Sequence, residues 1–117
     1  MGTFHVSIAI GDSQGQRWEA VEALVDTGST YTWLPRPLLK RLGVLPQLRR
    51  GFETADGRVI ERDMAITLVR WNEETMPTLV VFGGGSDAIL LGAYTLESFG
   101  VAPDPVNQRL VRVRGWQ

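Results

Sequence analysis

The chain has 117 residues, of which 44% are hydrophobic and 21% are charged, values that are ordinary for a globular protein able to bury a core. Its 12 basic and 13 acidic residues give a net charge of −1, so no excess of charge indicates a nucleic acid or an anionic membrane as partner. The lack of cysteine excludes disulfides and thiolate metal sites, and a single histidine, His5, argues against a histidine-based metal site.

The N-terminal segment "MGTFHVSIAIGD" has no basic region and reaches a polar turn too early for a signal peptide. No apolar run approaches the length that spans a membrane. We therefore expect a soluble, cytoplasmic protein with one domain over residues 1–117.

The first part of the chain is predicted to form strands. Residues 4–10 alternate apolar and polar side chains, which predicts a strand with one buried face. The segment "GDSQG" is typical of a hairpin connection, and residues 17–25 return as a second strand that ends at Asp26. A short third strand is predicted at 31–35, and leucines at helical spacing before a glycine predict a helix at 36–43.

An Asp-Gly pair at 56–57 lies between two strand-like runs within residues 51–69, which is a strong signal for a β-hairpin. The remaining elements are expected as a turn at 71–75, a strand at 76–82, a loop at 83–87, a buried strand at 88–92, a helix at 93–100, a turn at 103–108 and a strand at 109–115. Seven or eight strands with two short helices predict an all-β fold that is closed or sandwich-like.

Asp26 is the residue that most needs explanation, because it ends an apolar strand and is followed by Thr27, Gly28 and Ser29. A carboxylate is costly to bury, so it is either paired or used in chemistry. One interpretation is structural: an aspartate before Thr-Gly commonly binds its own downstream N–H groups in an Asx turn.

The segment "LVDTGSTYTWLP" resembles the catalytic loop of aspartic proteases of the pepsin–retropepsin clan. "AILLGAYTLESFG" is similar to the apolar-apolar-Gly strand and helix late in that fold, and the tail "GVAPDPVNQRLVRV" resembles bacterial retropepsin-like proteins. The resemblance covers nearly the whole chain. It implies a closed retropepsin-like (acid protease) β fold, an aspartic endopeptidase, and no cofactor or metal.

For the catalytic loop, the resemblance implies that Asp26 is the catalytic carboxylate. Thr27 would brace the partner loop through its hydroxyl, and Gly28 would let backbone N–H groups approach the carboxylate. Ser29 is expected to donate a hydrogen bond to Asp26, which would favour its ionised form.

The chemistry needs two carboxylates facing one water, yet the chain has a single Asp-Thr-Gly. An active protease must therefore be a homodimer in which each chain supplies Asp26, acting on a peptide or protein substrate. The terminal segments at 4–10 and 109–115 are candidates for an intersubunit sheet. Thr30 and Ala93 replace an Asp and an Arg that pair near the interface in many retropepsins.

The resemblance also implies that the hairpin at 51–69 is a flap over the substrate, with Ala55, Asp56, Gly57 and Arg58 as its contact residues. An ordinary surface hairpin is the alternative. Trp33 is expected to line the substrate cleft, and Trp116 is a candidate anchor for the dimer interface.

The other notable residues have simpler interpretations. His5 lies on the polar face of its strand, and "GGGS" at 83–86 lacks the Lys-Ser/Thr helix start of a phosphate loop, which favours a flexible loop. Solvated strand edges are expected for the arginines Arg49, Arg50, Arg109, Arg112 and Arg114.

Two alternatives to the protease remain open. The first is a catalytically inactive retropepsin-fold dimer that acts as a protein-binding or assembly module. The second is an unrelated small β domain in which Asp26 is structural.

Overall fold

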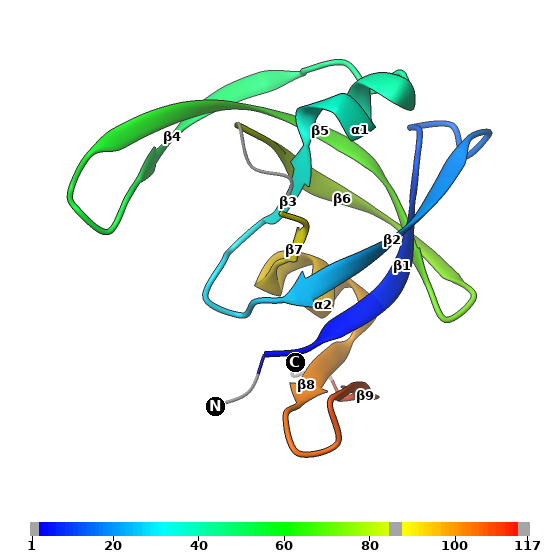
Figure 1. Cartoon of the computed structure of the whole chain (residues 1–117). Coiled ribbons are helices and arrows are strands. Elements are labelled where there is room, and N and C mark those ends of the chain that lie inside the picture. The colour runs from blue at the N-terminus through cyan, green and yellow to red at the C-terminus, as the bar shows by residue number, and fades with distance from the viewer. Residues whose placement is uncertain (1–2, 85–87, 115–117) are drawn as a thin grey trace.

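Nine strands and two short helices make up the part of the chain that the computed structural model describes, residues 3–84 and 88–114 (Figure 1). They are, in chain order, β1 (His5–Gly11), β2 (Trp18–Val25), β3 (Thr32–Pro35), α1 (Arg36–Arg41), β4 (Leu48–Glu53), β5 (Val59–Trp71), β6 (Glu74–Gly83), β7 (Leu90–Leu91), α2 (Ala93–Phe99), β8 (Val101–Asp104) and β9 (Arg109–Arg112). The expectation of an all-β fold with two short helices is confirmed.

Seven of the strands form one sheet in the order β1-β2-β7-β3-β6-β5-β4. Because β1 also pairs with β5 through Ala9 and Ile10, six of these strands close into a barrel, and β4 extends beyond it. Two neighbouring pairs, β2–β7 and β3–β6, are parallel. Strands β8 and β9 form a separate antiparallel ribbon at the bottom of Figure 1.

The length of β5 creates the feature that dominates the outline of the molecule. Its first part, up to Met64, pairs with β4, and the part from Met64 onward pairs with β6. The β4–β5 hairpin therefore projects from the barrel as a curved arm (Figure 1). The predicted Asp56–Gly57 turn lies at the end of this arm, where Gly57 has a φ of 84° that suits glycine.

Side chains on the faces that were predicted to be buried fill the interior of the barrel. Phe4, just before β1, is buried together with Ile8 and Ile10 of β1, and Leu38, Leu39 and Leu42 of the first helical segment pack into the same core. Both helices stop at glycines: Gly43 has a φ of 74°, and Gly100 caps α2 with a φ of 67°.

Three details differ from the predictions. The turn expected at 71–75 is a tight hairpin loop of two residues, Asn72 and Glu73. Both have positive φ, the backbone geometry whose twist matches that of the flanking strands. Val101–Asp104 is a strand that was expected to be mostly turn, because its pairing with β9 is not visible in local pattern. The expected strand at 88–92 is reduced to Leu90–Leu91.

Two expectations fall outside the described residues: Trp116, and the part of the "GGGS" segment beyond Gly84.

Candidate active site

Asp26 lies at the carboxyl end of β2, next to the end of β7. Its backbone N–H donates to the carbonyl oxygen of Leu91 at 3.0 Å, and the N–H of Val25 donates to the carbonyl of Phe4 at 2.9 Å. The strands on either side of β2 therefore fix the point at which the chain leaves the sheet. The Asp26 side chain itself is half-buried.

The loop after Asp26, residues 26–31, turns back on the carboxylate. The N–H of Gly28 donates to Asp26 Oδ1 at 3.0 Å, and the N–H of Ser29 donates to the Asp26 carbonyl oxygen at 3.1 Å. A Cβ at position 28 would lie 3.3 Å from Oδ1, so glycine permits this close approach. The contact is an Asx turn, and it also supplies the backbone N–H that an ionised catalytic carboxylate uses.

The expectation that the Ser29 hydroxyl donates to Asp26 is wrong within the single chain. The hydroxyl donates instead to the carbonyl oxygen of Tyr31 at 2.7 Å. Serine side chains readily bind backbone carbonyls close by in sequence, and here that acceptor is two residues away.

The Asp26 loop is held from behind by the start of α2. The N–H groups of Ala93 and Tyr94 donate to the carbonyl oxygens of Ser29 and Thr30, at 2.8 and 2.9 Å. These are first-turn N–H groups, which have no acceptor within the helix. The loop and the late apolar-apolar-Gly motif, more than sixty residues apart in sequence, are therefore one structural unit.

Three buried threonines lie beneath this unit. Thr95 Oγ1 is 2.6 Å from Thr32 Oγ1 and 2.9 Å from Thr78 Oγ1, and the Gly92 N–H donates to Thr32 Oγ1 at 3.1 Å. All three threonines are at most 2% exposed. The sequence did not indicate this network, although Thr32 and Thr78 lie within apolar strand runs, which is a signal for buried hydroxyls; Thr95 lies in α2.

A cleft of about 620 Å³ opens beside the Asp26 loop, beneath the β4–β5 hairpin. The loop contributes Gly28, Ser29, Thr30 and Tyr31 to its lining, and β3 contributes Trp33. Phe52 of β4 makes edge-to-face contacts with Tyr31 and Trp33, with ring centroids 6.2 and 5.2 Å apart. Trp33, the residue predicted for a substrate cleft, lines this space together with Tyr31 and Phe52, which the sequence had not indicated.

The expected contact residues at the hairpin tip are placed differently. Ala55, Asp56, Gly57 and Arg58 are exposed and do not line the cleft. The hairpin contributes instead Arg50, Gly51, Phe52, Glu53, Thr54 and Ile60. The tip extends past the cleft of a single chain, because six residue pairs of β4 and β5 carry it outward. In the tip, hydrogen bonds from the Thr54 hydroxyl and from the Arg58 backbone lower the pKa of the Asp56 carboxyl.

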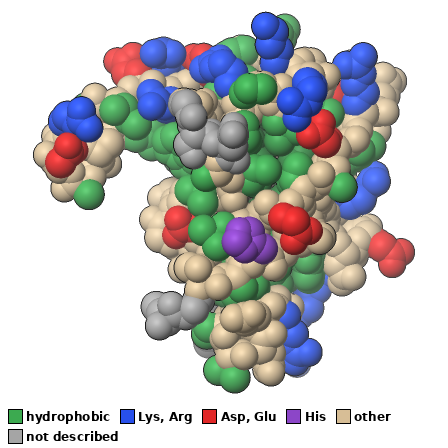
Figure 2. Space-filling view, viewed as in Figure 1, with side chains coloured by type: hydrophobic (Ala, Val, Ile, Leu, Met, Phe, Trp, Pro, Cys, Tyr) green, Lys and Arg blue, Asp and Glu red, His purple; other side chains and the backbone are tan. Residues whose placement is uncertain are grey.

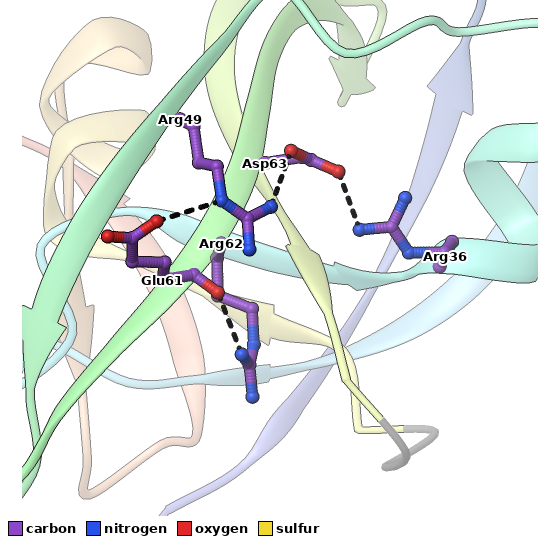
Figure 3. Close-up of polar contacts among 5 residues, drawn as sticks. All are labelled: Arg36, Arg49, Glu61, Arg62 and Asp63. Carbon is purple, nitrogen blue, oxygen red and sulfur yellow. Dashed lines mark hydrogen bonds and ion pairs between the residues drawn. The ribbon is translucent and has the colours of Figure 1, made fainter.

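Ion pairs fix the base of the hairpin to α1 (Figure 3). Asp63 accepts from Arg36 at 2.8 Å and from Arg49 at 3.0 Å, and Arg49 also pairs with Glu61 at 3.0 Å. The hydrogen bond from Arg36, followed by that from Arg49, lowers the pKa of the Asp63 carboxyl.

The arginines expected to be solvated are exposed, and four of them also have specific contacts. Arg49 belongs to the ion-pair network at the hairpin base, and Arg50 lines the cleft. Arg112 pairs with Glu74 and donates to the Phe99 carbonyl, while Arg109 is 4.0 Å from Asp104. The alternation that predicted exposed strand edges carries no information about which carboxylates lie on the neighbouring strands.

On the other side of Asp26 lies a second hollow of about 490 Å³. Its lining combines the start of the chain, the Asp-Thr-Gly segment and two prolines: Thr3, Phe4, Val25, Asp26, Thr27, Gly28, Pro103 and Pro105. Among these residues Asp26 is the only acid. The Thr27 side chain is exposed, and its hydroxyl makes no hydrogen bond within the described ranges.

Residues 3–84 and 88–114 contain no cluster of three or more potential metal ligands. Their helices include none with the length and apolar character needed to cross a membrane. His5 is exposed on β1.

The closed barrel, the Asp-Thr-Gly loop braced by a late helix and the projecting hairpin together define a retropepsin-like aspartyl protease domain. The family model of the gag-polyprotein putative aspartyl proteases matches residues 14–98, and the chain belongs to this family. The comparison with curated proteins gave no match. Family membership supports a protease-type function for the chain.

Proposed function

We propose that this chain is an aspartic endopeptidase that acts as a homodimer, with Asp26 of each copy forming the catalytic pair. The observation that carries the proposal is the position of Asp26, half-buried and fixed by the Gly28 N–H where the cleft and the second hollow meet. Asp26 lines the second hollow, and Gly28, which holds it, lines both spaces. The Asp26 carboxylate therefore lies beside the cleft and faces the space in which we propose that the partner carboxylate lies.

The proposed chemistry follows from two carboxylates that share one proton, the arrangement that characterises aspartic proteases. The ionised Asp26 takes a proton from a water molecule, and the oxygen of that water attacks the peptide carbonyl carbon. The protonated partner donates a hydrogen bond to the carbonyl oxygen. When the tetrahedral intermediate collapses, the C–N bond breaks and the leaving nitrogen receives a proton from the pair.

The dimer is supported by what a single chain lacks. Besides Asp26, the two linings contain one acid, Glu53, which belongs to the hairpin rather than to the Asp26 loop. The second hollow is largely apolar and is lined by Thr27, whose hydroxyl has no hydrogen-bond partner among the described residues, as expected of a surface that receives the same loop from another copy. On the described strands, the N-terminal part of β1 and the outer edge of β9 remain free for an intersubunit sheet.

The decisive experiment compares wild type with Asp26→Asn on an unfolded protein substrate from mildly acidic to neutral pH. We expect cleavage by wild type and a loss of at least about a thousandfold in the variant, because asparagine cannot take the proton from water. Both proteins should have the same mass in solution and the same thermal transition. Cleavage that survives in Asp26→Asn contradicts the proposed role of this residue.

A folded wild-type dimer that cleaves nothing in a broad peptide mixture would favour the alternative, a retropepsin-fold module that binds or assembles proteins. A folded monomer without activity would instead favour a structural role for the Asx turn at Asp26.

A further inference from the structure

The two faces of the β4–β5 hairpin place neighbouring arginines in different surroundings. Arg49 and Arg50 are consecutive in β4, so their side chains leave the strand on opposite faces. Arg49 is bound by both Glu61 and Asp63. Arg50 lines the cleft, and its Nη1 donates a hydrogen bond to the Tyr31 hydroxyl at 3.1 Å. Within the described part of the chain it has no carboxylate partner.

A second guanidinium lies on the same face. Arg62 of β5 is directly opposite Arg50 in the strand register. It extends away from the ion-pair network at the hairpin base (Figure 3) and donates from Nη1 to the carbonyl oxygen of Glu61 at 2.9 Å. Its Nε is buried and has no hydrogen-bond partner among the described residues.

Like charges directly opposite on an antiparallel pair are unfavourable, so the cost of this pair needs an explanation. Glu53 is the acid that the hairpin adds to the cleft lining, but it lies three positions from Arg50 and alternates to the other face. The Arg50–Arg62 face is therefore electropositive, although the whole chain has a net charge of −1. In the space-filling view, basic side chains are frequent along the upper part of the molecule, where the hairpin and α1 lie, and acidic side chains stand among them (Figure 2).

We propose that Arg50 makes the cleft select peptides with a carboxylate side chain, aspartate or glutamate, close to the bond that is cleaved. This inference rests on the proposed endopeptidase function. A guanidinium has five N–H donors, and Tyr31 accepts from one, so a two-point contact to a carboxylate remains available. The aromatic rings of Trp33 and Phe52 in the same lining exclude water from one side of that contact and strengthen it.

The first experiment digests a proteome-derived peptide mixture with the wild-type dimer and compares the residues that flank the cleaved bonds with those of uncut peptides. We expect Asp and Glu to be enriched at one flanking position. A synthetic peptide pair that differs by Glu against Gln at that position then gives the preference as a ratio of kcat/KM. A ratio of about ten is expected for a partly exposed charged hydrogen bond.

The variants assign the preference to Arg50. Arg50→Gln should bring the Glu/Gln ratio close to one, and Arg50→Glu should reverse it in favour of a Lys peptide. Arg49→Gln is the matched control: it removes the neighbouring charge on the other face and should leave the ratio near ten. Tyr31→Phe removes the hydroxyl partner but keeps the charge, so it should also preserve the preference.

Cleavage without enrichment of acidic residues, or a preference that survives Arg50→Gln, overturns this inference and leaves the endopeptidase in place. Loss of the preference in Arg49→Gln as well would assign it to the shape of the hairpin and equally overturn it. Failure of wild type to cleave any peptide in the mixture overturns the proposed function, and the inference with it.

Discussion

Gly92 approaches Tyr31 so closely that a Cβ at position 92 would lie 2.3 Å from the Tyr31 carbonyl oxygen and 2.9 Å from that of Ser29. Its φ of −89° is open to any residue, so space and not backbone conformation requires glycine here. This contact allows α2 to bind the Asp26 loop from behind. The late glycine of the family pattern is thus explained by the packing of two backbones.

Gly92→Ala should therefore destabilise the protein by about 3 kcal/mol, because the obstructing atoms are backbone and cannot rotate away. Urea unfolding measures the change. Gly43→Ala is a suitable comparison, since nothing lies within 4 Å of its Cβ and only its φ of 74° opposes a side chain, at a cost of about 1 kcal/mol. Equal losses in the two variants would contradict the steric explanation.

Thr95→Val should cost about 2 kcal/mol, because it leaves the buried hydroxyls of Thr32 and Thr78 without their shared partner. Valine has nearly the same shape, so the loss reports hydrogen bonding and not volume. Thr75→Val, an exposed position, should change the free energy of unfolding by less than about 0.5 kcal/mol. A Thr95→Val protein as stable as wild type would show that the network contributes nothing.

Asp63 predicts how stability depends on pH. Its pKa in the folded protein lies below the ordinary value of 3.8 because of Arg36 and Arg49. The unfolded state therefore takes up the proton first, and the stabilisation is fully present above the unfolded pKa and lost as pH falls through the folded pKa. The difference in Tm between wild type and Asp63→Asn should therefore shrink as pH falls from neutrality into the acid range below 3.8. A constant difference over that range would exclude the ion pairs as its cause.

Thr27→Ala tests the dimer without altering the carboxylate. If the Thr27 hydroxyl binds the partner loop, its removal should raise the dissociation constant of the dimer about tenfold, measured by analytical ultracentrifugation. Specific activity should then decline at a correspondingly higher protein concentration. Ser13→Ala, an exposed serine in the turn after β1, should leave the dissociation constant unchanged. A Thr27→Ala dimer as tight as wild type would refute this contact.

The local sequence was sufficient where the determining interactions lie within a few residues. Alternation predicted the buried face of β1, the Asp56–Gly57 pair predicted the hairpin, and glycine at 43 and 100 predicted the helix ends. Each of these depends on backbone conformation or on a period of side chains, which a short window contains.

The site was less predictable, because its members come from separate strands. Tyr31, Phe52 and Arg50 come together only because β4 folds over the Asp26 loop. The Ser29 hydroxyl donates to the Tyr31 carbonyl oxygen instead of the Asp26 carboxylate. Similarly, nothing in the neighbourhood of Arg49 indicates that Glu61 and Asp63 face it across the hairpin.

By itself, the sequence determined that this is a mostly β chain with an Asp-Thr-Gly loop after a buried strand. That loop supplies one carboxylate, whereas the chemistry of the family uses two. The tertiary structure alone decided which atoms support that loop and which side chains line the cleft. The physical reason is that a strand's partners and its register are set by contacts between distant segments, and those contacts fix the surroundings of Asp26 and Arg50.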